Sequence, residues 1–112
     1  MVNEEFIDKW KSQVKKGTLA FIILNTLQNR ELYGYELIET VRVHTEIEIA
    51  EGTLYPLMNR LKKEGLVEAK WVEQESGIPR KYYNLTVSGV KTLEKMSKYW
   101  NELEESIKKL KK

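Results

Sequence analysis

The chain has 112 residues, of which 41% are apolar and 32% charged, and this balance predicts a single globular domain with a modest core. It contains no cysteine, which excludes disulfides, thiolate nucleophiles and thiolate metal sites. The longest apolar stretch, 19–27, is far shorter than a bilayer span, and the opening residues lack the apolar segment of a signal peptide, so we expect a cytoplasmic protein. The net charge of +2 combines 19 basic with 17 acidic residues, so the placement of charge must decide whether nucleic acid is a partner.

Two apolar stripes predict that residues 4–28 form one long helix or two abutting helices, with Gly17 between the stripes. The first stripe consists of Phe6, Ile7, Trp10 and Val14, and the second consists of Ala20, Ile23, Leu24 and Leu27. After a break at 32–34, the helical spacing resumes and predicts a second, shorter helix over 35–43.

Segment 47–49 alternates apolar and charged side chains, which predicts a very short strand. A third helix follows, and we expect it to begin near Gly52 or Thr53, because Pro56 lacks an amide hydrogen and is best tolerated in the first turn. Its apolar side consists of Leu54, Leu57, Met58 and Leu61. Gly65 is placed to cap its end.

Alternating side chains over 67–72 and 80–85, separated by turn residues, predict a β-hairpin. Tyr82 and Tyr83 point to opposite faces of this hairpin, and we expect Tyr83 in the core and Tyr82 to be more exposed. Thr86 is suited to cap a last helix that runs to the C-terminus.

The predicted order is helix, helix, short strand, helix, hairpin, helix, which is typical of a winged helix-turn-helix fold. The expected fold class is therefore mainly α with a small β-hairpin. We assign residues 1–85 to a winged helix-turn-helix DNA-binding domain with an N-terminal helical arm, and residues 86–112 to a C-terminal dimerisation helix. In such folds the third helix enters the major groove and the hairpin, called the wing, reaches a neighbouring groove or phosphate.

The exposed face of the third predicted helix carries groups that can read bases and hold phosphates. This face consists of Thr53, Tyr55, Pro56, Asn59, Arg60 and Lys63. Arg80 and Lys81 are adjacent cations that we place on the turn of the wing, where they would neutralise phosphates, with Tyr82 beside them. The sequence therefore predicts that double-stranded DNA is the partner. The alternative is a winged-helix adaptor that joins protein partners without specific DNA binding.

The last predicted helix carries an a/d heptad seam, which predicts that it pairs with another helix in a homodimer. The seam consists of Leu93, Met96, Trp100, Leu103, Ile107 and Leu110. The alternative is a single amphipathic helix lying on its own domain. Trp100 is too bulky for a tight two-stranded seam, so it indicates either splayed helices with a pocket between them or packing against the partner's N-terminal stripe, where Phe6 and Trp10 lie.

No pattern of catalytic residues, phosphate-binding loop or metal box occurs in the chain, so we expect neither an enzyme nor a cofactor. His44 is the only histidine. It lies near Glu46 and Glu48 and could bind a metal with them, but a loop histidine beside surface acids is the simpler interpretation, and we expect no metal site.

Three sequence blocks together resemble the PadR family of transcriptional repressors. They are YGYELI at 33–38, GTLYPLMNRLKKEGLV at 52–67 and PRKYYNLTVSG at 79–89, and the resemblance covers nearly the whole chain. The single last helix is similar to the compact subgroup of that family. The resemblance implies a bacterial repressor acting as a dimer, with Tyr35 joining the residues of the third helix at the groove and Arg80 and Lys81 gripping the DNA backbone. Ile78 and Asn84 depart from the usual wing pattern.

The resemblance also implies a ligand site. In multidrug-sensing members of the compact subgroup, a tryptophan from each last helix stacks on a flat aromatic drug in a pore at the dimer centre. Trp100 falls at the matching position, and by the same matching Met96, Val14, Gly17 and Phe21 line the pore.

Overall fold

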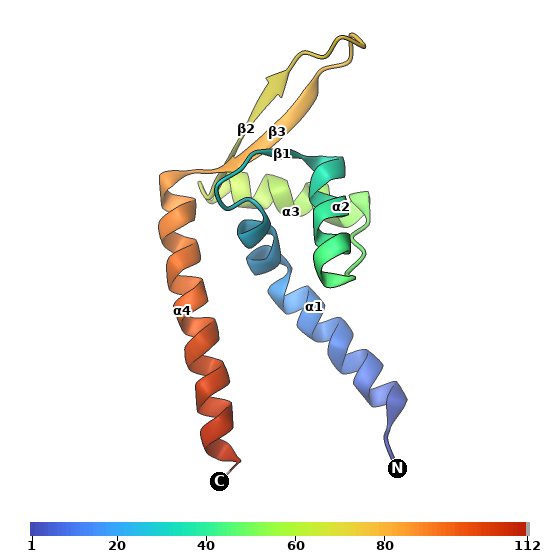
Figure 1. Cartoon of the computed structure of the whole chain (residues 1–112), viewed down its shortest axis with the longest axis vertical. Helices are drawn as coiled ribbons and strands as arrows, with labels where there is room; N and C mark the ends of the chain where they lie inside the picture. Colours follow the sequence, from blue (N-terminus) through green and yellow to red (C-terminus); the bar gives the residue numbers. More distant parts are fainter. Residues whose placement is uncertain (112) are drawn as a thin grey trace.

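The computed structural model describes residues 1–111 and contains four helices and three short strands (Figure 1). In chain order these are α1 (Glu4–Thr26), β1 (Leu32–Tyr33), α2 (Gly34–Thr45), α3 (Glu51–Lys63), β2 (Val67–Val72), β3 (Arg80–Leu85) and α4 (Val87–Leu110). The predicted fold class, a mainly helical winged helix-turn-helix with a β-hairpin and a long last helix, is confirmed. Residue 112, the end of the predicted segment 86–112, lies outside the described residues.

The N-terminal stripes belong to one continuous helix, α1, which settles the choice that the sequence left open. The side chain of Asn3 caps it by accepting a hydrogen bond from the N–H of Phe6 at 3.0 Å. At the start of the last helix, Thr86 caps α4 as predicted by accepting a hydrogen bond from the N–H of Gly89 at 2.9 Å.

The three strands form one antiparallel sheet in the order β1-β3-β2. The strand predicted at 47–49 was wrong: that segment has no sheet partner, and its alternation reflects the packing of Ile47 and Ile49 against the core from within a loop. The short strand lies instead before α2, at Leu32–Tyr33, where it pairs with the free edge of β3. A strand needs a partner for its backbone groups, and β3 offers that edge to the segment before α2.

Helix α3 begins at Glu51, one or two residues before the predicted start, so Pro56 lies in its second turn and not in its first. Because proline has no N–H, Pro56 cannot donate to the carbonyl of Gly52 one turn earlier. The C-terminal end is as predicted: Gly65 adopts a positive φ of 75°. The N–H of Leu66 donates to the carbonyl of Leu61, and that of Gly65 to the carbonyl of Lys62, both at 3.0 Å, which is a complete Schellman motif.

All four helices and the base of the sheet contribute to the core. Its members are Ile23, Leu24, Leu27, Leu37, Val41, Ile49, Leu54, Leu57, Met58, Leu61, Val67, Tyr83 and Leu93. Leu93 is only 3% exposed, so the expectation that it belongs to a dimer seam was wrong: the core is not closed until the first turns of α4 pack against it. Gly89 permits this approach, because a Cβ at that position would run into the backbone carbonyl of Leu66.

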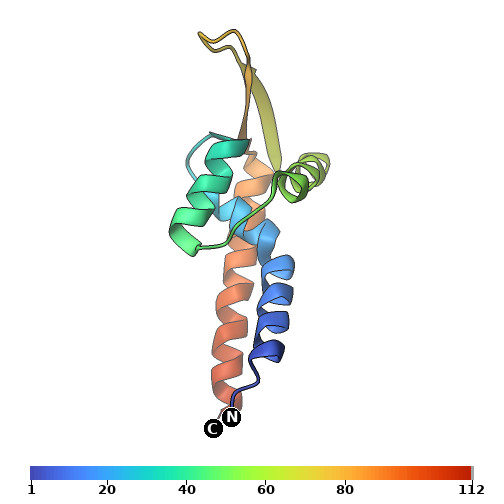
Figure 2. The same cartoon turned by 90° about the vertical axis from the view of Figure 1, so that its right-hand side faces the viewer.

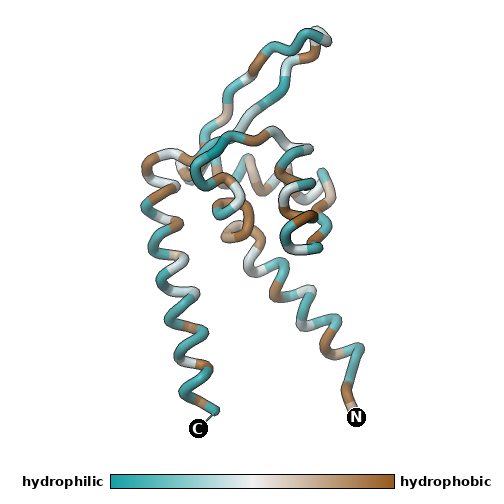
Figure 3. The backbone as a smooth tube through the Cα atoms, in the orientation of Figure 1, coloured by the Kyte–Doolittle hydropathy of each residue, from teal (hydrophilic) through white to brown (hydrophobic). Residues whose placement is uncertain are grey.

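Beyond the core, the N-terminal half of α1 and the C-terminal half of α4 leave the body as two separate arms (Figures 1 and 2). The molecule is therefore elongated, with principal extents of 58 × 31 × 22 Å. Apolar bands recur along both arms (Figure 3). The wing projects from the opposite end of the body. Among residues 1–111, no helix combines the length and apolar character needed to cross a membrane.

Candidate nucleic-acid interface and apolar hollows

Helix α3 presents one apolar and one polar face, as its sequence predicts. Leu54, Leu57, Met58 and Leu61 are buried. The opposite face is exposed and consists of Thr53, Tyr55, Pro56, Asn59, Arg60 and Lys63. Two depressions divide this face: Tyr55 and Asn59 border the wing, whereas Thr53, Pro56 and Arg60 border α1. The structure therefore brings together hydroxyl, amide and guanidinium groups on one accessible surface.

Tyr55 has a structural contact that the sequence did not reveal. Its phenol lies against the backbone of Gly34 at the start of α2, where a side chain would collide with the phenol oxygen. Tyr55 thus packs against the start of α2 in addition to lining the exposed face. The signal was present in the sequence as a glycine between two tyrosines, 33 and 35, but nothing there named its partner.

The wing cations are not on the turn, where we had placed them. Arg80 and Lys81 are the first two residues of β3, and successive strand residues point to opposite faces. The guanidinium carbon of Arg80 lies 4.5 Å from the centroid of the Tyr33 ring. Lys81 is half-buried on the other face, with its Nζ 5.7 Å from the ring centroid of Trp71. Each cation is therefore held over an aromatic ring.

Three tyrosines surround the Arg80 side of the wing. Tyr82 pairs with Tyr33 across the strands, and their rings meet edge to face with centroids 5.4 Å apart. Tyr35 is exposed, and its ring centroid lies 6.4 Å from that of Tyr33. Tyr83 is buried as predicted, and this burial, with the neighbouring Tyr55, raises the pKa of its hydroxyl.

A notch of about 390 Å³ separates α3 from the wing. Tyr55 and Asn59 form one wall, and Trp71 and Lys81 are on the wing side. Sequence reasoning missed Trp71, although an indole on the outer part of a wing, 66% exposed, is an unusual surface residue.

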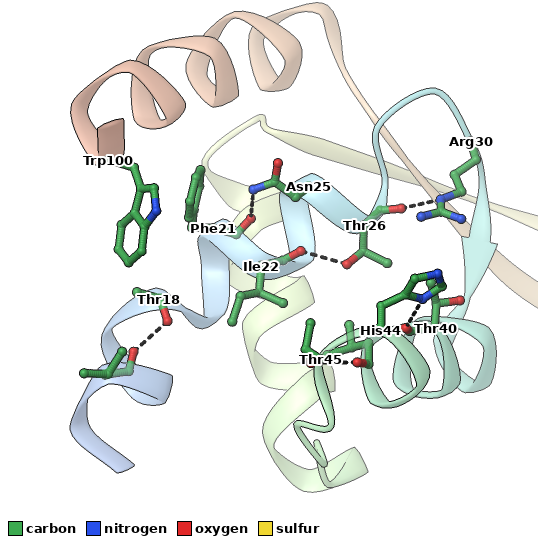
Figure 4. Close-up of a pocket in the computed structure, with 12 residues that line it drawn as sticks. Thr18, Phe21, Ile22, Asn25, Thr26, Arg30, Thr40, His44, Thr45 and Trp100 are labelled. Atoms are coloured by element: carbon green, nitrogen blue, oxygen red, sulfur yellow. Dashed lines mark hydrogen bonds between the residues drawn. The ribbon is translucent and has the colours of Figure 1, made fainter. Parts of the chain in front are cut away.

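The five residues predicted to bind a ligand converge on two neighbouring hollows. Gly17, Phe21, Met96 and Trp100 line a hollow of about 490 Å³ between α1 and α4, which we call the Trp100 hollow. Val14, Phe21 and Trp100 belong to a second hollow of about 410 Å³, which extends between α1 and α2 (Figure 4) and which we call the α1–α2 hollow. The rings of Phe21 and Trp100, with centroids 5.6 Å apart, border both hollows.

The remaining residues of the predicted seam differ in exposure. Met96 packs partly against the core, whereas Trp100, Leu103, Ile107 and Leu110 are exposed. Phe6 and Trp10 on α1 are 66% and 55% exposed. His44 binds the carbonyl of Thr40 through Nδ1 at 2.8 Å. Within residues 1–111, no group of three or more histidine or carboxylate side chains is arranged to hold a metal.

Comparison with known proteins identifies the relatives of this chain. Residues 23–95 match the model of the transcriptional regulator PadR-like family. An uncharacterised protein of Lysinibacillus sphaericus is 34% identical over 99 residues, covering 87% of this chain and 91% of that protein. The transcriptional regulator YqjI of Escherichia coli K12 is 31% identical over 94 residues, covering 82% of this chain and 44% of YqjI. The crystal structure of a PadR family transcriptional regulator from Eggerthella lenta superposes with a TM-score of 0.86 at 34% identity, covering 96% of this chain and 93% of that one.

The contact between Gly34 and Tyr55 yields a stability prediction. Gly34→Ala should destabilise the fold by about 1–3 kcal/mol, because its methyl group would displace the Tyr55 phenol. In a Tyr55→Leu background the same substitution should cost clearly less, as urea unfolding of the four variants would measure. Gly52→Ala is the control, since nothing lies within 4 Å of its added methyl. An equal cost of Gly34→Ala in both backgrounds would contradict the assigned contact.

Proposed function

This chain belongs to the PadR-like family of transcriptional regulators, and we propose that it is a homodimeric repressor whose hold on operator DNA is released by a flat aromatic ligand. As a member of that family it is a DNA-binding transcriptional regulator and not an enzyme. Membership favours DNA over the protein-adaptor alternative. The proposal adds the dimer, the sign of regulation and the ligand.

The observation that carries this proposal is the division of the molecule into one end that carries the polar face of α3 and the wing, and another that consists of two arms with exposed apolar stripes. The polar face of α3 and the wing with Arg80 lie at one end of the core, and the two arms leave from the other (Figure 1). In the proposed complex α3 enters the major groove and Arg80, stacked on Tyr33, contacts a phosphate. We assign DNA reading to residues 1–85 and dimerisation to residues 86–112, with Leu93 joining the last helix to the core.

The exposed C-terminal half of α4 is the evidence for the proposed dimer. All described residues from 98 onward are exposed, although this part of the helix carries the regularly spaced apolar residues Trp100, Leu103, Ile107 and Leu110. An isolated helical arm of this length is only marginally stable in water, and its apolar stripe gains stability when a second copy covers it. The exposed Phe6 and Trp10 of α1 offer the same copy further apolar surface.

The Trp100 hollow is the evidence for the proposed ligand. Its volume of about 490 Å³ lies in the range of small-molecule sites, and its lining is mostly apolar, with Phe21, Met96, Tyr99, Trp100 and Leu103 among its large side chains. Since Trp100 belongs to the proposed dimer helix and Phe21 to α1, a flat compound between them would alter the angle of the arms. A change in that angle alters the spacing of the two α3 helices, and this couples ligand to DNA.

The dimer is tested by mass in solution. We expect the wild-type chain to sediment at twice its 13.2 kDa mass at micromolar concentration, and Leu103→Glu to sediment as a monomer, because the carboxylate would be buried in the interface. Asn101→Glu, on the same helix but outside the apolar stripe, should remain dimeric. Monomeric wild-type protein would contradict the dimer.

DNA recognition is tested with Arg60→Gln, which keeps the length and polarity of the α3 side chain but removes its charge. We expect a loss of affinity of about 1–3 kcal/mol for a duplex from upstream of its own gene, measured by fluorescence anisotropy over a series of salt concentrations. Arg42→Gln, on α2 and paired with Glu39 at 2.8 Å, is the control and should bind normally. Unchanged affinity in a folded Arg60→Gln protein would remove α3 from the interface.

The ligand site is tested with N-phenyl-1-naphthylamine, a neutral aromatic probe that accepts tryptophan emission. We expect it to quench the fluorescence of the wild-type protein, and Trp100→Ala to lose most of this quenching, because Trp100 is the indole that borders both hollows. Trp71→Phe, on the wing, should retain it. Quenching that survives in Trp100→Ala and disappears in Trp71→Phe would place the probe at the wing.

A further inference from the structure

The α1–α2 hollow has a different chemistry from the Trp100 hollow. Its lining comes from α1, the loop after it, α2 and one residue of α4 (Figure 4). The lining residues are Val14, Thr18, Phe21, Ile22, Asn25, Thr26, Arg30, Thr40, Val41, His44, Thr45 and Trp100. None of the twelve is acidic, in a chain with 17 carboxylate side chains, whereas two of them, Arg30 and His44, are basic. Its volume of about 410 Å³ suits a small organic molecule.

Most of the hollow's surface offers no hydrogen to a ligand. Three of its threonines donate their hydroxyl hydrogens to carbonyls one turn earlier in their own helices, at distances of 2.6–2.7 Å: Thr18 to Val14, Thr26 to Ile22 and Thr45 to Val41. Their donors are therefore used within the protein. With the side chains of Ile22, Val41 and Phe21, these threonines form a surface that favours an apolar molecule.

The guanidinium of Arg30 supplies free donors at the end of the hollow opposite Trp100. Arg30 uses its Nε to bind the carbonyl of Thr26 at 2.6 Å, which fixes the guanidinium at the C-terminal end of α1. Its two Nη groups take part in no ion pair among residues 1–111. His44 lies at the same end of the hollow, where its Nδ1–H donates to the carbonyl of Thr40, so Nε2 of the neutral ring is an acceptor and the Nη groups of Arg30 are the donors for an anion (Figure 4).

We propose that the α1–α2 hollow binds a flat apolar organic anion, with a carboxylate or sulfonate head on the Nη groups of Arg30. The aromatic body lies over Ile22 and Val41 and ends against the rings of Phe21 and Trp100. A planar guanidinium with two free donors matches the two oxygens of such a head. The inference rests on the proposed function, because it identifies a second class of ligand that would share the Trp100 wall.

The test compares two probes that differ in their charge. 8-Anilinonaphthalene-1-sulfonate carries an anionic head on the same aromatic body that N-phenyl-1-naphthylamine presents without charge. Each is titrated into wild-type protein without DNA, and binding is followed by probe fluorescence. Arg30→Gln should weaken binding of the sulfonate about tenfold or more, the loss of one charge-assisted contact, and leave the neutral probe within about twofold.

Matched variants separate this site from its neighbours. Arg42→Gln removes an arginine of α2 that does not line the hollow and should bind both probes normally. Arg30→Lys keeps the charge and should retain most of the sulfonate affinity, which separates a role in binding from a role in folding. Lys95→Gln removes the cation of the Trp100 hollow and should have little effect on the sulfonate.

Two results would overturn the inference. One is unchanged sulfonate affinity in Arg30→Gln; a loss in Lys95→Gln would then put the anion in the Trp100 hollow. The other is an equal loss of both probes in Arg30→Gln while Arg30→Lys binds no better. Because no DNA is present, these results are independent of operator release: a ligand that binds through Arg30 but leaves the DNA complex intact would contradict only the proposed function.

Discussion

The antiparallel pairing of β1 with β3 fixes the position of the wing relative to α2 and α3. Two residues form it, with Leu32 opposite Tyr83 and Tyr33 opposite Tyr82. On one face it brings the Tyr33 ring beneath Arg80, and on the other Tyr83 enters the core. The next residue in the chain, Gly34, is the one against which the Tyr55 phenol rests. A short strand thus connects the positions of α2, α3 and the wing, and these are the parts that contact DNA in the proposed complex.

The same core leaves the arms without partners in their own chain. Leu93 is the last residue of α4 that is fully buried, and the helix continues for 17 more residues to Leu110, with an apolar stripe that is exposed from Trp100 onward. Burial therefore ends where the proposed interface begins. Because Leu93 joins α4 to the core, a change in the angle of α4 at that interface would also turn the core. This continuity is what would allow a ligand near Trp100 to act on DNA binding at the far end of the molecule.

Two hollows with one common wall differ in their chemistry. The rings of Phe21 and Trp100 form that wall. On the α4 side the lining is apolar with a single lysine, Lys95, whereas on the α2 side Arg30 and His44 face an apolar surface. A neutral aromatic compound and an aromatic anion would thus bind on opposite sides of the same pair of rings.

The sequence alone determined those features that depend on residues close together in the chain. The polar and apolar faces of α3, its glycine stop, the hairpin, the burial of Tyr83 and the cap at Thr86 follow from periodicity and from the backbone preferences of single residues. Tertiary structure decided what depends on contacts between distant segments: that β3 takes its partner from 32–33 and not 47–49, that Leu93 joins the core, and that Arg80 stacks on Tyr33. Alternation along a chain records which side chains are buried, but the residue that covers them is fixed only when the elements pack.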